Sequence, residues 1–219
     1  IIIDSSETPV IFDLSNHYKT RLNISYLKVS NKYPGEARNI GINNAKSNYV
    51  AILDSKTIPN KDWLSNAFNK LISNNLDAVF GSTVYIAETS FQSVLQACIY
   101  GIKPVVTTPG TIISKKSFNE IGLFIEGVRA SDDLEWRNRV RGSKLNTDSL
   151  MGGELSYTEI SKNFASELKR NFIYQFHSAL TEVQMNTKIF IMGLSLLLIS
   201  LVIPHWNAIV GSKDSILYV

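Results

Sequence analysis

The chain has 219 residues, of which 44% are hydrophobic, so it can bury a substantial core and is not expected to be disordered. Its formal net charge of +3, from 22 basic and 19 acidic residues, is too balanced to indicate nucleic-acid binding. The single cysteine excludes a disulfide framework and fits a reducing compartment. Because the chain opens on three isoleucines without an initiator Met, we expect a fragment that lacks its first strand.

The first part of the chain alternates short apolar segments with helical patterns. Strands rich in β-branched or aromatic residues are predicted at residues 1–3, 24–29, 49–53 and 78–80. Helices are predicted at residues 36–46 and 61–74. The second helix should bury one apolar face, formed by Trp63, Leu64, Ala67, Phe68, Leu71 and Ile72. This alternation predicts an α/β fold with a mostly parallel sheet flanked by helices.

Two aspartates directly follow predicted strands. Asp4 follows the first strand and Asp54 the third. Ligands of open α/β sheets bind at the carboxyl ends of the strands, so both side chains are candidates for a binding site. Farther on, residues 112–126 are predicted to form a strand, a short helix and a turn, and a new helix should begin near Ser131, a suitable N-cap.

The pattern changes after about residue 158. Apolar residues recur every four positions, which predicts an amphipathic helix within residues 159–187, at Phe164, Leu168, Phe172, Phe176 and Leu180. A helix packed on the domain explains this pattern about as well. Residues 188–211 contain a long apolar run flanked by Lys188 and Lys213, which favours a transmembrane segment over a buried core helix. The domains expected are thus residues 1–158, 159–187, 188–211 and a tail at 212–219.

Several separated segments occur in the order found in one known family. They are residues 35–42 (GEARNIGI), the strand 49–53 followed by Asp54-Ser55-Lys56, then Pro59 and Trp63, and residues 131–139 (SDDLEWRNR). Together they resemble the family 2 glycosyltransferases over about residues 1–144. The resemblance implies a GT-A-like fold that binds a nucleotide sugar, most often uridine-linked. It also implies an inverting, membrane-associated enzyme with a cytoplasmic catalytic domain and a lipid-linked or envelope polysaccharide acceptor.

The resemblance assigns four residues to the donor. Asp4 would bind the nucleotide base, Arg38 and Asn39 would lie near the nucleotide, and Asp54 would hold a ribose hydroxyl or a divalent metal, Mg or Mn. Each also has an ordinary structural explanation: an aspartate forms turns at strand ends, and an arginine is commonly a surface residue.

Lys56 departs from the family pattern. The family usually has a second aspartate at this position, and one carboxylate alone holds a divalent ion weakly. Metal dependence is therefore doubtful, and we hypothesise that the Lys56 ammonium pairs with the diphosphate instead. A solvated loop lysine is at least as good an explanation.

The resemblance places the acceptor beside Asp133, which would act as the general base. A base of this kind must reach the acceptor hydroxyl within hydrogen-bond distance. The same pattern assigns to the acceptor side Gly110, Thr111, Asp132, Trp136 and Arg139. A charged helix N-terminus would also explain the two aspartates, a helical tryptophan is more often part of the core, and Arg139 could simply pair with Glu135.

Two other functions remain open. A non-catalytic, membrane-anchored relative that keeps the fold is favoured by Lys56. A nucleotidyltransferase on a related sheet would need a Gly-rich phosphate loop, which is not visible in this sequence. The sequence also lacks the Gln-x-x-Arg-Trp motif of processive polysaccharide synthases, which favours transfer of a single sugar.

Overall fold

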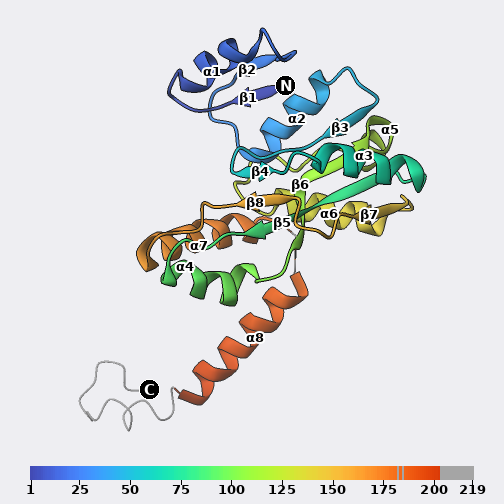
Figure 1. Ribbon diagram of the computed structural model, residues 1–219. Helices are drawn as coiled ribbons and strands as arrows, with labels where there is room; N and C mark the ends of the chain where they lie inside the picture. The colour runs from blue at the N-terminus through green and yellow to red at the C-terminus, as the bar shows by residue number, and fades with distance from the viewer. Residues whose placement is uncertain (182, 184, 203–219) are drawn as a thin grey trace. The chain divides into compact units, whose positions relative to one another are not determined.

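The computed structural model describes residues 1–181, 183 and 185–202 (Figure 1). The chain divides into two compact units, Ile1–Thr181 and Glu182–Val219, and each is described by itself. The first unit contains all the candidate site residues named above and every strand in the described part of the chain.

Strands and helices alternate through most of the first unit. Its strands are β1 (Ile2–Asp4), β2 (Tyr26–Lys28), β3 (Tyr49–Ala51), β4 (Thr57–Pro59), β5 (Ala78–Tyr85), β6 (Val105–Ser114), β7 (Thr147–Ser149) and β8 (Leu155–Tyr157). Its helices are α1 (Val10–Tyr18), α2 (Pro34–Asn44), α3 (Trp63–Ser73), α4 (Ser90–Leu95), a π-helical turn η1 (Gln96–Tyr100), α5 (Lys115–Ile121), α6 (Asp132–Gly142) and α7 (Phe164–Ala179).

Local sequence signals account for where two of these helices begin. Pro34 occupies the first turn of α2, and the Glu36 carboxylate accepts a hydrogen bond from the Tyr33 N–H at 3.0 Å. At α4, Thr89 and Gln92 cap each other, through bonds of 3.2 and 3.1 Å between side chains and backbone N–H groups. These caps satisfy N–H groups that the helix itself leaves without partners.

The strands form two sheets. A small parallel sheet pairs β1 with β2, and a larger sheet has the order β3-β6-β5-β8-β4, with β7 beside β5. In the larger sheet β6 runs antiparallel to β3 and β5, and β4 runs antiparallel to β8, whereas β7 and β8 run parallel to β5. The prediction of a mostly parallel sheet is therefore wrong: the sheet is mixed, with helices flanking it (Figure 1).

The strand responsible for this difference is β6. It spans ten residues, whereas the apolar pattern predicted a strand only from residue 112. Its first half, residues 105–109, is rich in β-branched residues, but Pro109 and Gly110 interrupt the strand pattern between the two halves. That half pairs with the distal part of β5, and the second half lies between β3 and β5.

Two glycines allow β5 and β6 to approach closely. A Cβ at Gly81 would lie 1.9 Å from the Pro109 carbonyl oxygen, a distance that no side chain can tolerate. Gly110 has a φ of +85°, which favours glycine, and its carbonyl accepts a hydrogen bond from Trp63 Nε1 at 3.0 Å. A register shift lies between Val79 and Gly81.

The buried hydrophobic residues form two clusters, each of which joins strands of the larger sheet to helices. One cluster contains the aromatic residues Phe80, Phe118, Phe124 and Trp136. Another contains Trp63, Ala67 and Leu71 of α3, which are 5%, 0% and 2% exposed. The apolar face predicted for α3 is too wide, because its other three members are exposed: Leu64, Phe68 and Ile72.

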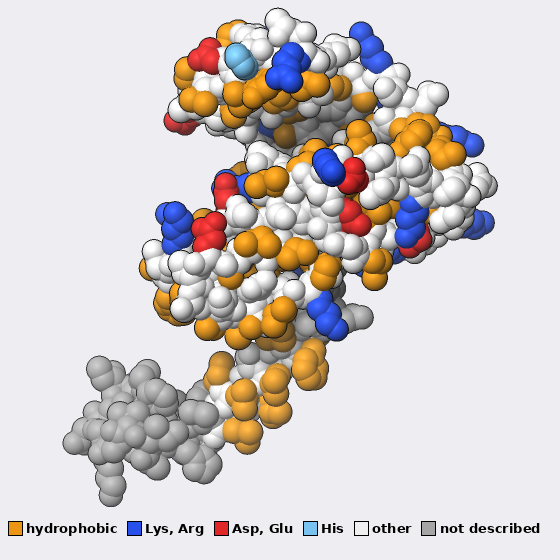
Figure 2. Space-filling view, in the orientation of Figure 1, with side chains coloured by type: hydrophobic (Ala, Val, Ile, Leu, Met, Phe, Trp, Pro, Cys, Tyr) orange, Lys and Arg blue, Asp and Glu red, His pale blue; other side chains and the backbone are white. Residues whose placement is uncertain are grey.

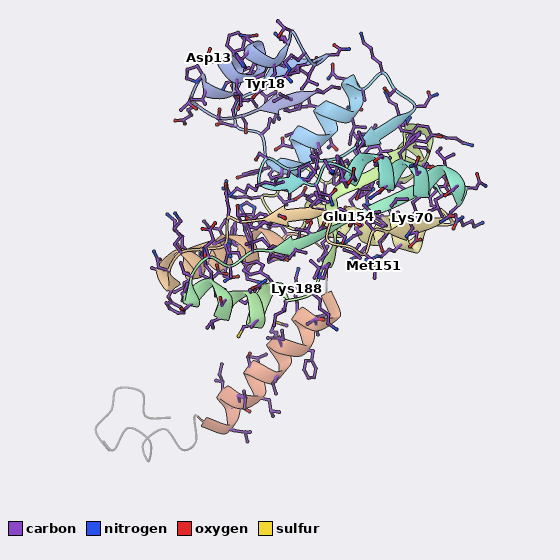
Figure 3. All side chains as sticks on the ribbon, in the orientation of Figure 1. Asp13, Tyr18, Lys70, Met151, Glu154 and Lys188 are labelled. Carbon is purple, nitrogen blue, oxygen red and sulfur yellow. The ribbon has the colours of Figure 1, made fainter. Side chains whose placement is uncertain are left out.

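Lys70 also fastens α3 to the sheet. Its Nζ donates to the Ser149 carbonyl at 2.8 Å and pairs with the Asp148 carboxylate at 2.7 Å (Figure 3). Both partners belong to β7, so the helix is held to the strand that flanks β5.

The amphipathic helix is confirmed as α7, but its polar side is the one that is buried. Glu167 is 4% exposed and accepts hydrogen bonds from Arg170 and Asn171, the second at 2.8 Å. The apolar stripe at intervals of four residues is exposed by 59–76%: Phe164, Leu168, Phe172, Phe176 and Leu180. A helix packed on the domain through its apolar stripe is therefore not what forms.

The described part of the second unit is mainly α8 (Met185–Val202). Hydrophobic side chains gather along it, with Ile189, Phe190 and Leu196 more than half exposed (Figure 2). Among the described residues, no helix is both long and apolar enough to cross a membrane, so the predicted transmembrane helix is not confirmed. Residues 203–211 of that prediction, and the predicted tail at 212–219, lie outside the described residues.

Candidate active site

Arg38 of α2 connects two carboxylates that lie far from it in the sequence. Its Nη2 donates to both oxygens of Asp54, at 2.8 and 3.0 Å, and its Nη1 donates to Asp132 Oδ2 at 2.5 Å. Asp54 follows β3 and Asp132 begins α6, so one guanidinium joins three elements. The fold thus brings together three residues that the sequence assigned to donor and acceptor.

This cluster of Arg38, Asp54 and Asp132, the Arg38 cluster, is largely closed to solvent. The Arg38 and Asp132 side chains are 10% and 4% exposed, whereas Asp54 is 35% exposed. Burial disfavours the charged form of the Arg38 guanidinium. The negative charges of Asp54 and Asp132 favour that form more strongly, so the pKa of Arg38 is raised. Burial also raises the pKa of Asp132 to about 6, although Arg38 acts against this.

Gly35 allows α2 to approach Asp132. A Cβ at Gly35 would lie 2.8 Å from the Ile125 carbonyl oxygen and 3.0 Å from Asp132 Oδ2. Gly35 is buried in the first turn of α2. Its role is to leave room for the carboxylate that Arg38 contacts.

Asp133 lies next to the Arg38 cluster but is not part of it. Ser131, before it, has a φ of +69° and occupies the N-cap position, although its side chain makes no capping bond. Among the described residues, the Asp133 carboxylate accepts a hydrogen bond only from the Leu134 N–H, at 2.8 Å. The Asp133 carbonyl accepts one from Thr108 Oγ1 at 3.2 Å. Asp133 is partly exposed, unlike the buried Asp132 beside it.

The Lys56 side chain pairs with a carboxylate that does not belong to the Arg38 cluster. Its Nζ lies 2.7 Å from Glu159 Oε2, and both side chains are more than half exposed. Exposed pairs of this kind contribute little to stability, so Lys56 can leave Glu159 at small cost. Glu159 also lines a cavity of about 600 Å³ between β8 and α7, whose lining includes neither Asp54 nor Asp133.

The residues present do not fit a divalent cation held by the protein alone. Both oxygens of Asp54 accept hydrogen bonds from Arg38, and Lys56 occupies the position of the usual second aspartate. In the part of the chain that the structure describes, no group of three His, Cys, Asp or Glu residues could hold a metal ion. Arg38 therefore binds the one carboxylate that a metal could use here, and a lysine stands in the sequence where a second carboxylate would be needed.

Asp4 is held tightly at the end of β1. Its carboxylate accepts hydrogen bonds from Tyr26 Oη at 2.6 Å, from the Ser6 N–H at 2.8 Å and from Lys28 Nζ at 3.1 Å. Burial opposes ionisation, but these bonds together hold the pKa of Asp4 well below its usual range. The bond from Tyr26 also raises the pKa of that phenol to about 12.

Two residues predicted at the site fasten the framework. The Asn39 side chain, 2% exposed, bonds the N–H and the carbonyl of Phe124, each at 2.9 Å. Arg139 binds Glu135 at 2.6 Å, as the spacing on the helix allows, and also donates to the carbonyls of Ile121 and Leu123. Both side chains thus hold parts of the protein together, and their predicted contacts with a ligand stay predictions.

Three acceptor-side predictions fall on buried residues. Trp136 is 0% exposed, packs against Phe118 and Phe124, and donates from Nε1 to the Gly122 carbonyl at 3.1 Å. Thr111 is also 0% exposed, and Gly110 is buried where β6 meets β5. Trp136 cannot stack on an acceptor, because its ring is enclosed by other aromatic rings.

Sequence reasoning missed four residues, which are Tyr85, Tyr157, Arg137 and Arg170. The charges of Asp133, Arg137 and Arg170 act on the Tyr85 phenol. Burial raises the pKa of Tyr85 and of Tyr157. The spacing could have indicated Arg137, because residues four apart share one face of a helix. Nothing local could have indicated the other three.

Solved structures with a similar fold include that of S. aureus TarS in complex with UDP-GlcNAc. This likeness has a TM-score of 0.57 at 17% sequence identity and covers 75% of this chain and 50% of that chain. A second structure, of S. aureus TarS in complex with UDP, gives a TM-score of 0.55 at 18% identity, covering 71% of this chain and 49% of that chain. At these identities the likeness shows the α/β GT-A-like fold, with a curled mixed sheet flanked by helices.

Curated relatives also match most of the first unit. An uncharacterized glycosyltransferase of Rickettsia felis is 27% identical over 150 residues, which are 61% of this chain and 23% of that protein. The chondroitin synthase of Escherichia coli is 28% identical over 146 residues, 63% of this chain and 21% of that protein. The chain thus spans less than a quarter of the length of these relatives. The glycosyl transferase family 2 domain matches residues 1–129, more than half of the chain, and the protein belongs to that family.

Proposed function

We propose that this chain carries the catalytic site of an inverting glycosyltransferase, which moves a sugar from a UDP-sugar to a hydroxyl group. The single observation that carries the proposal is the arrangement at the start of α6. There the buried Asp132 binds Arg38, whereas the neighbouring Asp133 keeps a partly exposed carboxylate with one hydrogen bond. Family membership and the nucleotide-bound TarS structures support a nucleotide-sugar donor.

On the donor side, Asp54 and Arg38 would hold the nucleotide. Asp54 is the more exposed carboxylate of the Arg38 cluster and could accept a hydrogen bond from a ribose hydroxyl. Arg38 and Lys56 would offset the charge of the diphosphate, which becomes the leaving group. Asp4 would contact the base through oxygens that Tyr26 and Lys28 already orient.

On the acceptor side, Asp133 would act as the general base. Its carboxylate takes the proton of the acceptor hydroxyl, and the oxygen attacks the anomeric carbon from the face opposite the diphosphate. The new carbon–oxygen bond forms as the bond to the diphosphate breaks. UDP leaves with the electron pair, and the anomeric configuration is inverted.

The acceptor would be lipid-linked or part of an envelope polysaccharide, with the catalytic unit on the cytoplasmic side of a membrane. The exposed stripe of α7, which includes Phe164, Phe172 and Phe176, supports contact with a lipid surface. We expect the complete protein to float with anionic vesicles, and Phe172→Ser with Phe176→Ser to weaken this. Equal flotation of the variant would contradict a role for α7.

A non-catalytic relative is the second candidate, because Lys56 replaces the usual second aspartate. It would bind nucleotide sugars without turnover.

One experiment separates the two candidates. Release of UDP is measured from a panel of UDP-sugars with the complete protein in membranes, in Mg²⁺, in Mn²⁺ and in chelator. Asp133→Asn should lower the rate by about 100-fold or more while nucleotide binding is retained. Chelator should leave release intact and Lys56→Ala should abolish it. If chelator abolishes UDP release, the proposal that Lys56 offsets the diphosphate charge in place of a metal is wrong. If nucleotide binds but no condition gives release, the non-catalytic candidate is favoured.

A further inference from the structure

Arg137 is a half-buried cation with few partners. It lies on α6, four residues after Asp133 and on the same helix face. Of its five N–H donors, the described residues accept only one, through the Val106 carbonyl, and the buried Nε has no hydrogen-bond partner. Among the described residues, no carboxylate lies within ion-pair distance of it. A buried guanidinium left in this state is costly unless a ligand completes it.

A group of aromatic rings lies nearby, with a second arginine. Tyr85 stacks on Tyr100, with ring centroids 4.7 Å apart, and lies 5.3 Å from Tyr157. The Arg170 guanidinium lies 5.2 Å from the centre of the Tyr100 ring, and one of its nitrogens binds Glu167. Rings and guanidinium thus form a continuous set from β5, β8, η1 and α7.

Backbone and side-chain contacts connect Arg137 to this group. Arg137 donates to the Val106 carbonyl, and Val106 pairs with Ser82 of β5, the strand that carries Tyr85. The charges of Asp133, Arg137 and Arg170 also act on the Tyr85 phenol. We use the name Arg–Tyr cluster for this set: Tyr85, Tyr100, Tyr157, Arg137 and Arg170. It contains two arginines, and among the residues that the structure describes Glu167 is the one carboxylate that pairs with them.

We propose that the Arg–Tyr cluster is an acceptor subsite for a sugar or polyol unit that carries an anionic group, either a carboxylate or a phosphate. The proposal rests on the proposed function, because it places the acceptor against Asp133 as the base. The apolar face of the unit would pack on the tyrosine rings. Its anion would bind the unused N–H donors of Arg137 and Arg170.

The chemistry distinguishes this ligand from a neutral one. A neutral sugar would use the rings and the hydroxyl groups but would leave the charge of Arg137 uncompensated. An anion supplies the missing ion pair in a partly desolvated place, where a charge-assisted hydrogen bond is about twice as strong as a neutral one. Binding should therefore depend on the charge of the ligand.

The test measures binding of three probes to the complete protein with UDP present, by calorimetry. The probes are tetragalacturonate, its fully methyl-esterified neutral form and a short glycerol phosphate oligomer. At least one anionic probe should bind about tenfold more tightly than the neutral ester. Arg137→Gln should remove this preference, Arg137→Lys should restore part of it, and Arg141→Gln, an equal loss of charge one turn farther along α6, should leave it unchanged. Tighter binding of tetragalacturonate would identify the anionic group as a carboxylate, and tighter binding of the glycerol phosphate oligomer would identify it as a phosphate.

Other outcomes would overturn the subsite. These are equal binding of ester and anions, no binding of either anion, or an equal effect of Arg141→Gln and Arg137→Gln. Asp133→Asn separates this proposal from the proposed function. If UDP release is absent or insensitive to Asp133→Asn while the anion preference persists, the proposed function fails but the anion site stands. If UDP release depends on Asp133 but the protein shows no preference for anionic probes, the proposed function stands and the anion site fails.

Discussion

The two halves of the candidate site treat charge in opposite ways. In the Arg38 cluster every charged group has a partner: one guanidinium binds two carboxylates at 2.5–3.0 Å. Next to it on α6, the Asp133 and Arg137 side chains have no ion pair among the described residues, and each of these side chains makes a single hydrogen bond. The first half is therefore assembled before any ligand arrives, whereas the second leaves groups that a ligand can complete. Breaking the first half should affect stability, and breaking the second should affect activity or binding.

The largest effect on stability is expected from Arg38→Met. This change leaves the Asp132 carboxyl, which is 4% exposed, without its cation, so it must either stay charged and unpaired or take up a proton. Removing one partner of a buried pair costs about 3–5 kcal/mol. We expect the free energy of unfolding in urea to fall by about this amount. The double variant Arg38→Met with Asp132→Asn should recover part of the loss. If the double variant is as unstable as the single one, the charge of Asp132 is not the reason.

A smaller effect is expected from Gly35→Ala. The added methyl group would lie 2.8 Å from a backbone carbonyl and 3.0 Å from Asp132 Oδ2, and overpacking of this kind costs about 1–3 kcal/mol. The matched control is Gly142→Ala at the end of α6, where a Cβ has nothing within 4 Å. Urea denaturation of both variants tests the difference. Equal changes would mean that α2 and α6 are not in close contact.

The smallest effect should depend on pH. Burial raises the pKa of Asp132 from 3.8 to about 6, so its charge costs stability despite Arg38. The stability that the neutral carboxyl contributes is complete below about pH 4 and is lost as the pH rises through 6. Asp132→Asn should therefore be more stable than the natural protein at pH 8, by on the order of 1–2 kcal/mol, and equal to it at pH 4. If Asp132→Asn is less stable than the natural protein at pH 8, the ion pair with Arg38 stabilises the protein by more than burial of the Asp132 charge costs.

Motif and position in the sequence indicated charged residues that the fold brings together. Arg38 donates to Asp54, although their role toward a donor stays a prediction, and Asp133 lies at the start of the helix predicted for it. This succeeded because strand ends and helix starts are local features, and they fix where a polar side chain leaves the backbone. The sequence could not show that Arg38 would also bind Asp132 from a distant helix.

The same local reasoning misplaced other residues. Asn39 follows Arg38 directly, yet a step of one residue on a helix turns the side chain to another face, where it bonds Phe124. Trp136 is three residues after Asp133 and packs into the aromatic core. A motif gives spacing along the chain, and only the packed helix decides which of its faces meets the ligand.

The sequence by itself determined the family, the alternation of strands and helices and the carboxylates at their ends. These features depend on periodicity, turn residues and motif order, which involve only residues that are close together in the chain. Only the tertiary structure decided the antiparallel course of β6, the burial of the polar side of α7 and the meeting of Tyr85, Arg137 and Arg170 near Asp133. Each of these depends on contacts between residues far apart in the chain. Such contacts are set by how close two backbones can approach, as at Gly81 and Gly35, and by which charges find partners once they are buried.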